Sequence, residues 1–329
     1  MTALFPITDD ERFTLVRIDA HASTLVDDVR RGLSSNPKSL PPRWFYDDLG
    51  SALFGAICQL PEYYVTRAET EILTTRRDEI VNAFGDAVRI IELGSGSARK
   101  TRILLDAIDG EFVYAPIDVD AGMLETSGRD LIGEYPDMRV RAICSDFARP
   151  SIPIRALPDH SGRTIVFFLG STIGNLDPVD AATMLRDLRK VLRRGDALFL
   201  GADLRKSKSI LEPAYDDAVG VTAAFNRNVL QRINRVLGAD FDLASFAHRA
   251  FYNEAFGRIE MHLVSTRAQR VRIGDLVVDF DEGETIHTES SYKHDETTLA
   301  ALAHAGGFTI ERRWTDSRGW FADLLMVAT

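Results

Sequence analysis

The sequence predicts an α/β protein with a doubly wound, mainly parallel sheet and a second, discontinuous α+β lobe. Three observations support this fold class. Short strand-like and helix-like segments alternate from residue 87 onward. The strand-like segments are nearly all apolar, as in parallel strands that are covered on both faces. The segments before residue 68 and over residues 204–292 do not continue the alternation, which places them outside the main sheet.

The elements of the sheet follow one another in regular order. An amphipathic helix is expected over residues 67–84, where apolar residues recur at helical spacing. The expected strands cover residues 88–93, 112–117, 140–144, 164–169 and 196–201. Of the expected helices between them, one ends near residue 107 and two cover residues 121–132 and 178–193. The tail adds a helix over 299–305 and strand material over 321–327. Such alternation implies right-handed crossovers between parallel strands.

The remaining segments form the second lobe in this prediction. Residues 20–33 show helical spacing, residues 204–247 are largely helical in character, and residues 257–281 resemble strands. We therefore expect two domains. The first comprises residues 68–203 and 293–329, and the second comprises residues 15–67 and 204–292.

The composition is that of a soluble globular protein and argues against two classes of partner. Of the 329 residues, 45% are hydrophobic and 27% are charged, and the formal net charge is −10. An acidic chain without a local basic patch has no general attraction for nucleic acid or for an anionic membrane. No apolar run approaches the ~20 residues that a membrane span needs. We expect neither partner.

The cysteines and histidines indicate neither a disulfide framework nor a metal site. The two cysteines, Cys58 and Cys144, are too few for such a framework and lack metal-ligand spacing. The seven histidines are scattered without a motif such as HExxH. Residues 1–10 carry acids and no apolar core, unlike a signal peptide. These features favour a cytoplasmic protein without a metal. We also expect a monomer.

The first strand of the sheet leads into Glu92-Leu93-Gly94-Ser95-Gly96, which is typical of a cofactor loop. Glycine permits positive φ angles and a close approach to a ligand, and ligands of open α/β sheets bind at this edge. A dinucleotide fingerprint would need a third glycine where Arg99 stands, which disfavours NAD. Rossmann-like methyltransferases use the shorter loop around S-adenosylmethionine. An incidental glycine turn is the alternative.

The second strand ends in Ile117-Asp118-Val119-Asp120, and Asp118 lies 22 residues after Gly96. An acid at this strand end can accept both ribose hydroxyls of a nucleoside. The competing role for an aspartate here is to cap the helix that follows. We assign ribose binding to Asp118 and capping to Asp120.

The third strand is followed by Ser145-Asp146-Phe147. In this fold, an acid and an aromatic residue at this position hydrogen-bond and stack the adenine. An ordinary acidic loop with a core phenylalanine is the alternative for this segment alone. Three such sites at three successive strand ends jointly indicate S-adenosylmethionine as the cofactor, with S-adenosylhomocysteine as its product.

Six longer motifs resemble one enzyme family. They are Lys38-Ser39-Leu40-Pro41-Pro42-Arg43-Trp44-Phe45-Tyr46-Asp47, Leu60-Pro61-Glu62-Tyr63-Tyr64, Phe168-Leu169-Gly170-Ser171-Thr172-Ile173-Gly174-Asn175-Leu176, Tyr215-Asp216-Asp217, Ala223-Ala224-Phe225-Asn226-Arg227-Asn228 and Arg258-Ile259-Glu260-Met261. From about residue 25 to 325 the chain resembles the histidine Nα-methyltransferases of ergothioneine biosynthesis. These enzymes make hercynine, the trimethyl betaine of histidine.

The resemblance implies a Rossmann-like class I methyltransferase sheet, a discontinuous substrate-binding lobe, and roles for single residues. It implies that S-adenosylmethionine is bound by Tyr46, Gly94, Lys100, Asp118, Asp146 and Phe147. It implies that the amino and carboxylate groups of L-histidine are held by Tyr63, Asn175 and Tyr215, and that the imidazole meets Glu289, Ser291 and Met261. The catalytic residues implied in this way are Tyr46, Tyr63 and Asn175.

The chemistry of methyl transfer fits these residue types. Transfer from a sulfonium is an in-line displacement, so positioning supplies much of the acceleration. An α-amino group has an ordinary pKa of about 8, so no strong base is needed to make it neutral. Tyrosine hydroxyls and an asparagine carbonyl accept amine hydrogen bonds without adding negative charge. Glu289 and Ser291 are two apart, so on an extended segment they share a face and can satisfy both imidazole nitrogens.

Alternatives remain for the function and for single residues. A tryptophan-type N-methyltransferase would share the domain but would need other groups in place of Glu289 and Ser291, and a non-catalytic S-adenosylmethionine-binding protein would keep only the fold. For single residues the alternatives are structural. They are a surface position for Glu289, a solvated helix position for Lys100, a helix cap for Asn175, and lobe core for Trp44, Phe45 and Tyr64.

Overall fold

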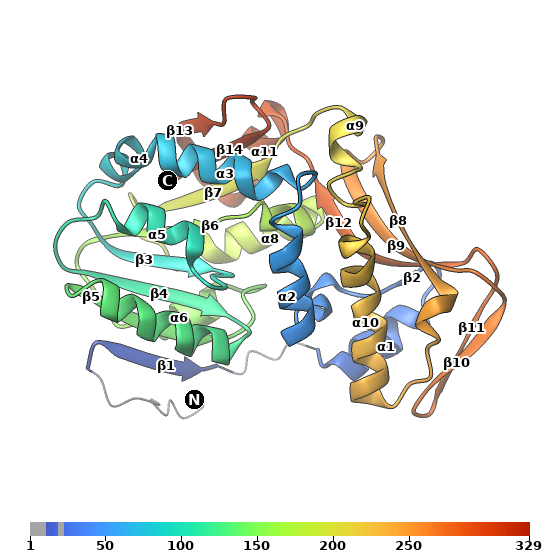
Figure 1. The fold of residues 1–329 in the computed structure, drawn as a ribbon. Helices are drawn as coiled ribbons and strands as arrows, with labels where there is room; N and C mark the ends of the chain where they lie inside the picture. Colours follow the sequence, from blue (N-terminus) through green and yellow to red (C-terminus); the bar gives the residue numbers. More distant parts are fainter. Residues whose placement is uncertain (1–10, 19–22) are drawn as a thin grey trace. The chain divides into compact units, whose positions relative to one another are not determined.

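The computed structural model describes residues 11–18 and 23–329, which form two compact units (Figure 1). The first unit contains residues 11–18, 68–204 and 294–329, and the second contains residues 23–67 and 205–293. Both units are therefore discontinuous in sequence. Residues 1–10, where we expect no signal peptide, lie outside the described residues.

The first unit is built on an eight-stranded sheet with the strand order β1-β5-β4-β3-β6-β7-β14-β13. Neighbouring strands from β1 to β7 in this order are parallel, whereas β14 pairs antiparallel with both β7 and β13. Helices α4, α5 and α6 lie on one face, and α8 and α11 lie on the other (Figure 1). This arrangement confirms the predicted α/β fold class. The chain order reverses between β3 and β6, where open α/β sheets bind their ligands.

The bounds of the elements in the first unit are as follows. The strands are β1 (Phe13–Arg17), β3 (Ala87–Leu93), β4 (Phe112–Asp118), β5 (Met138–Cys144), β6 (Arg163–Phe168), β7 (Ala197–Asp203), β13 (Phe308–Thr315) and β14 (Phe321–Ala328). The helices are α4 (Arg77–Phe84), α5 (Arg99–Leu105), α6 (Ala121–Glu134), α7 (Ser151–Ile154), η2 (Thr172–Asn175), α8 (Pro178–Arg189) and α11 (Glu296–Gly306). Helix α3 (Tyr64–Thr75) begins in the second unit and ends in the first.

Both faces of this sheet are covered by apolar side chains, which explains the continuous apolar runs in its strands. Phe168 of β6 belongs to a core shared with leucines of α8 and α11. Its neighbour Phe167 points the other way and meets Phe84 of α4 and Phe199 of β7 at ring-centroid distances of 5.5 and 5.6 Å. Successive strand residues alternate between faces. A strand buried on both sides must therefore be apolar throughout.

The start of the second lobe was predicted wrongly. Residues 15–17 belong to β1, which pairs in parallel with β5 at the edge of the main sheet. Phe13 is fully buried beside Gly128 of α6, where an added Cβ would lie 2.3 Å from the phenyl ring. The absence of a side chain at Gly128 therefore leaves room for Phe13 and for this extra strand. The strand is short and distant in sequence from its partner, so local pattern did not reveal it.

The second unit combines helices with a four-stranded sheet, β2-β12-β9-β8, and a separate hairpin, β10-β11. Its strands are β2 (Lys38–Ser39), β8 (Phe246–Asn253), β9 (Arg258–Ser265), β10 (Gln269–Ile273), β11 (Leu276–Phe280) and β12 (Thr285–Tyr292). Its helices are α1 (Leu25–Leu33), η1 (Pro42–Phe45), α2 (Asp48–Ile57), α9 (Lys208–Leu211), α10 (Val221–Leu237) and η3 (Leu243–Ser245). Helix α10 packs against α2 and against β8 and β9.

Two further details differ from the sequence-based expectation. The amphipathic segment 67–84 forms two helices, α3 and α4, that are separated at Arg76. Strands β8 and β13 were not expected. Strand β8 exposes Arg249, and β13 exposes Glu311, Arg312 and Arg313, so the apolar alternation of both strands is weak.

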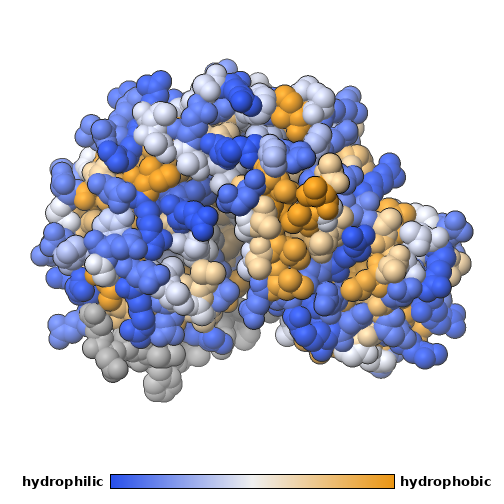
Figure 2. All heavy atoms as spheres, in the orientation of Figure 1, coloured by the Kyte–Doolittle hydropathy of each residue, from blue (hydrophilic) through white to orange (hydrophobic). Residues whose placement is uncertain are grey.

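The surface over α2 is unusually apolar (Figure 2). This helix buries Ile57 and Gly50 but leaves Leu49 42% exposed. Asp47 caps the helix by accepting from the Gly50 N–H and is itself bound by Asn228 of α10. The apolar helix is thus held in place by polar contacts at its start. Among the described residues, no helix combines the length and apolarity that crossing a membrane requires.

Candidate active site

The glycine loop after β3 lies at the point where the strand order reverses. Gly94 and Gly96 have φ angles of 72° and 49°, in the left-handed region that favours glycine. The Gly94 N–H donates to the carbonyl oxygen of Ile117 at the end of β4 (2.8 Å). A Cβ on Gly94 would lie 3.3 Å from the ring of Phe147. The loop therefore brings bare backbone close to an aromatic face.

Glu92, which precedes this loop, links the elements around it. Its carboxyl is buried and accepts hydrogen bonds from the hydroxyls of Thr101 on α5 (2.7 Å) and Tyr114 on β4. Burial raises the pKa of Glu92 to about 7. This carboxyl joins β3, β4 and the helix that follows the loop, and so fixes both ends of the loop.

Asp118 and Asp120 have different surroundings. Asp118 accepts from the Gly96 N–H (3.0 Å) and from the Asp120 N–H (3.1 Å), which places its carboxyl against the glycine loop. Burial raises the pKa of Asp118 above its ordinary value. Asp120 accepts from the Met123 N–H (2.9 Å) at the start of α6. The expected capping role of Asp120 is confirmed.

Asp146 and Phe147 follow β5 at the same sheet edge. The Asp146 carboxylate accepts from the Ala148 N–H (2.8 Å), which fixes the turn. Phe147 is half-buried and contacts Phe168 of β6 edge-on, with ring centroids 5.9 Å apart. Together with its approach to Gly94, this contact places Phe147 beside the ends of β3 and β6.

Lys100, whose side chain is 25% exposed, belongs to a charge cluster with buried carboxyls that sequence reasoning missed. It forms an ion pair with buried Glu69, whose other oxygen accepts from the Gly170 N–H (2.7 Å) after β6. Nearby Asp323 is fully buried, and its carboxyl oxygens have no hydrogen-bond partner among the described residues. Burial raises the pKa of Asp323 well above its ordinary value, and the charge of Glu69 adds to the effect. Lys100 is therefore not a solvated helix residue.

Asn175 ends the short helix η2 directly after β6 and is half-buried. The residue at the cap position of α8 is Asp177, not Asn175. The alternative role of Asn175 as a helix cap is therefore wrong. Its amide lies in the loop that leaves the carboxyl end of β6.

In the second unit, Glu289, Ser291 and Met261 share one face of the small sheet. Met261 of β9 pairs directly with Glu289 of β12, and Ser291 lies two residues further along β12. All three side chains are buried. Burial raises the pKa of Glu289 to about 7, although the charge of Lys293 lowers it. The structure thus brings the three predicted imidazole contacts together and shows that Glu289 is not a surface residue.

Lys293 is a buried residue that sequence reasoning did not assign to the site. Its ammonium donates to the hydroxyls of Tyr215 and Ser291, each at 2.8 Å. These two hydroxyls are 2.9 Å apart and hydrogen-bonded to each other. The side chain also lies over the Tyr215 ring, 4.6 Å from its centroid. The lysine thereby fixes the positions of two predicted substrate ligands.

The predicted tyrosines of this unit lie in a row of edge-on aromatic contacts. Tyr63 contacts Tyr215 and Phe54, with ring centroids 6.1 and 6.2 Å apart, and Phe54 contacts Tyr46 at 5.7 Å. Tyr63 is buried, which raises its pKa well above the ordinary value, whereas Tyr46 is 38% exposed. The Tyr63 hydroxyl is therefore neutral at physiological pH. A core position in this lobe was the alternative for three further aromatic residues. Of these, Phe45 and Tyr64 are buried and Trp44 is half-buried.

The main sheet, its glycine loop, and the acids and aromatic residue at its strand ends define a class I S-adenosylmethionine-dependent methyltransferase. Comparison with known proteins identifies the family. A model of histidine-specific, S-adenosylmethionine-dependent methyltransferases matches residues 25–328, and the chain belongs to this family.

Three curated relatives are similar over most of this chain. The histidine N-alpha-methyltransferase of Mycolicibacterium smegmatis is 50% identical over 94% of this chain and 96% of its own length. The protein of the same name from Mycobacterium tuberculosis is 48% identical over 92% and 94%. Ergothioneine biosynthesis protein 1 of Schizosaccharomyces pombe is 29% identical over 84% of this chain and 37% of its own, longer chain.

Proposed function

We propose that this protein transfers three methyl groups in succession from S-adenosylmethionine to the α-amino group of L-histidine. The products are hercynine and S-adenosylhomocysteine, and the reaction is the first step of ergothioneine biosynthesis. The observation that carries the choice of histidine is the buried pair Glu289 and Ser291 on one face of β12, with Met261 opposite. A carboxylate and a hydroxyl can satisfy the two nitrogens of an imidazole.

In this proposal, the cofactor is held mainly by the first unit. Gly94 gives the methionine part a close approach to the backbone, Asp118 accepts the ribose hydroxyls, and Asp146 with Phe147 binds the adenine. Their proximity to the end of β3 supports these roles. Lys100 and Tyr46 complete the proposed cofactor contacts.

The substrate amine and carboxylate are assigned to Tyr63, Asn175 and Tyr215. Neutral tyrosine hydroxyls and an amide oxygen can accept amine N–H bonds without stabilising the ammonium form. The lone pair is then free to attack the methyl group in line with the departing sulfur. Tyr46 and Tyr63 contribute aromatic faces that can stabilise the growing quaternary ammonium.

The two other functions are less well supported. An indole has one N–H and no acceptor nitrogen, so a tryptophan substrate would leave the buried carboxyl of Glu289 or the hydroxyl of Ser291 poorly partnered. A non-catalytic binding protein would not need a buried amino-acid site together with a cofactor loop.

The product of the reaction tests the proposal directly. Incubation with S-adenosylmethionine and each standard amino acid, followed by mass spectrometry, is expected to show a gain of three methyl groups on histidine alone. Methylated tryptophan would support the indole alternative, and no product with any amino acid would support the non-catalytic one. Either result would refute the proposal.

The glycine loop provides a test of the cofactor assignment. Gly94→Ala is expected to weaken S-adenosylhomocysteine binding by about tenfold or more in calorimetry, because the added methyl group presses on Phe147 at 3.3 Å. Gly110→Ala is the matched control, because Gly110 has a similar φ of 81° with nothing within 4 Å of the added Cβ. Equal affinities in the two variants would contradict the assignment.

Two expectations from the sequence remain part of the proposal. We propose that the enzyme acts as a monomer and that it works in the cytoplasm. Light scattering on the purified protein at micromolar concentration tests the first, with a mass of one chain, 36.6 kDa, as the expected result.

A further inference from the structure

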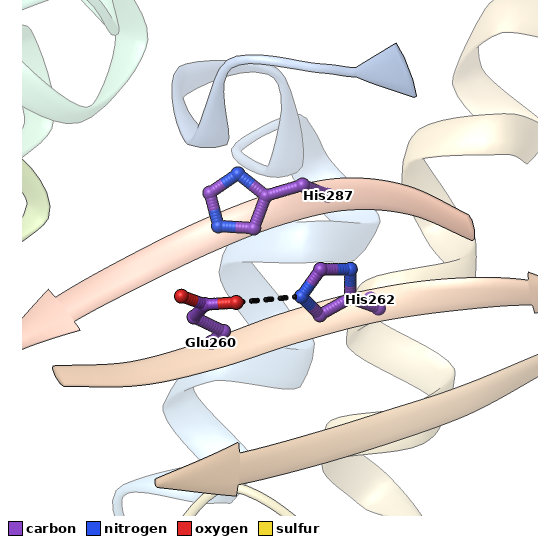
Figure 3. Close-up of side chains that lie close together, drawn as sticks. All are labelled: Glu260, His262 and His287. Carbon is purple, nitrogen blue, oxygen red and sulfur yellow. Dashed lines mark hydrogen bonds and ion pairs between the residues drawn. The ribbon is translucent and has the colours of Figure 1, made fainter. Parts of the chain in front are cut away.

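Three potential metal ligands converge on the face of the small sheet that points away from Glu289 and Met261 (Figure 3). Glu260 and His262 are two apart on β9, so they share a face, and antiparallel pairing places His287 of β12 directly opposite His262. One carboxylate oxygen and one nitrogen from each imidazole all lie within 4.8 Å of one another.

A β-bulge makes this convergence possible. On a regular strand, His287 and Glu289 would share a face because they are two residues apart. The register shifts between them, so that His287 pairs with His262 while Glu289 pairs with the next residue, Met261. A bulge of this kind re-aims side chains along a strand. The same irregularity therefore sends Glu289 to the proposed substrate face and His287 to the opposite one.

Neighbouring side chains hold the three groups in place. Phe251 stacks on the His262 ring with centroids 5.4 Å apart and planes at 15°. Arg258 and Asn253 bind one oxygen of Glu260 at 2.8 and 3.0 Å, which leaves the other oxygen 3.1 Å from Nε2 of His262. Groups that orient metal ligands in this way are typical of built metal sites.

The hydrogen bonding of the histidine rings also leaves capacity for a cation. Nδ1 of His262 is buried without a hydrogen-bond partner among the described residues. The ring is thus only partly satisfied by the protein.

We propose that Glu260, His262 and His287 bind one divalent transition-metal ion, with zinc as the best match. Two imidazoles and one carboxylate form a ligand set common for zinc, and imidazole disfavours magnesium and calcium. Metal–ligand bonds of about 2.1 Å place tetrahedral ligands about 3.4 Å apart, so the side chains would need to move by roughly 1 Å. The fourth position is left for water.

The ion would join β9 to β12 from the side opposite to the proposed substrate contacts. Because its ligands face away from Met261 and Glu289, the ion is assigned a structural role and no role in methyl transfer. Binding to the folded state alone stabilises that state. Chelation should therefore lower the melting temperature without changing the methylation rate at a temperature where the protein stays folded.

The test uses the untagged full-length protein, stripped with a chelator and titrated with zinc chloride in the absence of cofactor and histidine. One equivalent of zinc is expected to bind and to raise the melting temperature, and a chelator should reverse both effects. His262→Ala and His287→Ala are expected to weaken zinc binding by more than about 100-fold. His304→Ala, which removes an exposed histidine from α11, should bind zinc as the original protein does.

Each outcome decides for or against the site. Zinc affinity that is unchanged in both His262→Ala and His287→Ala, or no stoichiometric binding by the original protein, would refute the proposal. Circular dichroism without metal verifies that each variant is folded, and His287→Gln replaces His287→Ala if that variant is not. Bound Co²⁺ provides a second measurement, because its visible absorption is expected in the original protein and in His304→Ala but not in the His287 variant.

Discussion

Replacing Glu289 with alanine is expected to weaken L-histidine binding by about 100-fold while leaving the affinity for S-adenosylhomocysteine unchanged. Glu289 is 8% exposed and lies opposite Met261, so its carboxyl is desolvated where an imidazole would meet it. A hydrogen bond to a buried charged group contributes about 1.5–3 kcal/mol, and 2.7 kcal/mol corresponds to about 100-fold in affinity. Calorimetric titration of histidine into the protein saturated with S-adenosylhomocysteine measures the change.

The control for this prediction is Glu282→Ala, which removes an exposed glutamate from the loop before β12. It should bind histidine as the original protein does. If Glu289→Ala also binds histidine normally, the assignment of this carboxyl to the imidazole is wrong. Loss of cofactor affinity in Glu289→Ala would instead indicate general damage to the fold.

Much of the main sheet could be predicted from the sequence because its strands are buried on both faces. Strands such as β6 appear as unbroken apolar runs, and the helices between them keep their own periodicity. Strand β1 escaped prediction because its place depends on Phe13 meeting Gly128, more than 100 residues away. A contact between residues so far apart in the sequence produces no pattern within a short stretch of the chain.

The positions of the proposed cofactor residues were predicted better than the contacts of Lys100 and the pairing in the small sheet. The proposed cofactor residues follow strand ends, so topology alone places Gly94, Asp118 and Phe147 at one edge. The contacts of Lys100 were not foreseen, because Glu69 approaches it from a different helix. Pairing across the small sheet is equally invisible in the sequence, and the bulge before Glu289 reverses the face that simple alternation would assign to His287.

The burial of Lys293 is the clearest feature of the site that could not be predicted from the sequence. A lysine in a polar segment is normally exposed, yet this side chain is only 2% exposed. Its burial follows from two partners, Tyr215 and Ser291, of which one lies 78 residues away. Because its ammonium occupies acceptor lone pairs on both hydroxyls, their hydrogens are directed away from it. Only one of these hydrogens is used in the bond between the hydroxyls.

In the proposed site, this geometry gives Lys293 two effects on histidine binding. It holds the hydroxyls of Tyr215 and Ser291 at fixed positions by donating to both. The positive charge also lowers the pKa of Glu289 against the effect of burial. Both effects prepare the site for an imidazole, which needs an acceptor for its N–H and a donor for its second nitrogen.

Lys293→Met is therefore expected to weaken histidine binding by tenfold or more near pH 7 and to shift its pH dependence upward by about one unit. In the original protein the pKa of Glu289 is about 7, and removal of the neighbouring charge raises it further. In Lys293→Met, Glu289 is then protonated at pH values where it is still a carboxylate in the original protein. It becomes able to accept the imidazole N–H only at higher pH. Calorimetry between pH 6.5 and 9 follows this shift directly.

The substrate itself titrates in the same range, but it does so identically for every variant, so the difference between two proteins reports on the site. Lys208→Met is the matched control, because this exposed lysine pairs with Glu254 at the surface of the same unit. It should leave both the affinity and the pH profile unchanged. A loss of affinity in Lys293→Met without a shift in the profile would limit this lysine to holding Tyr215 and Ser291, and would contradict its effect on the charge of Glu289.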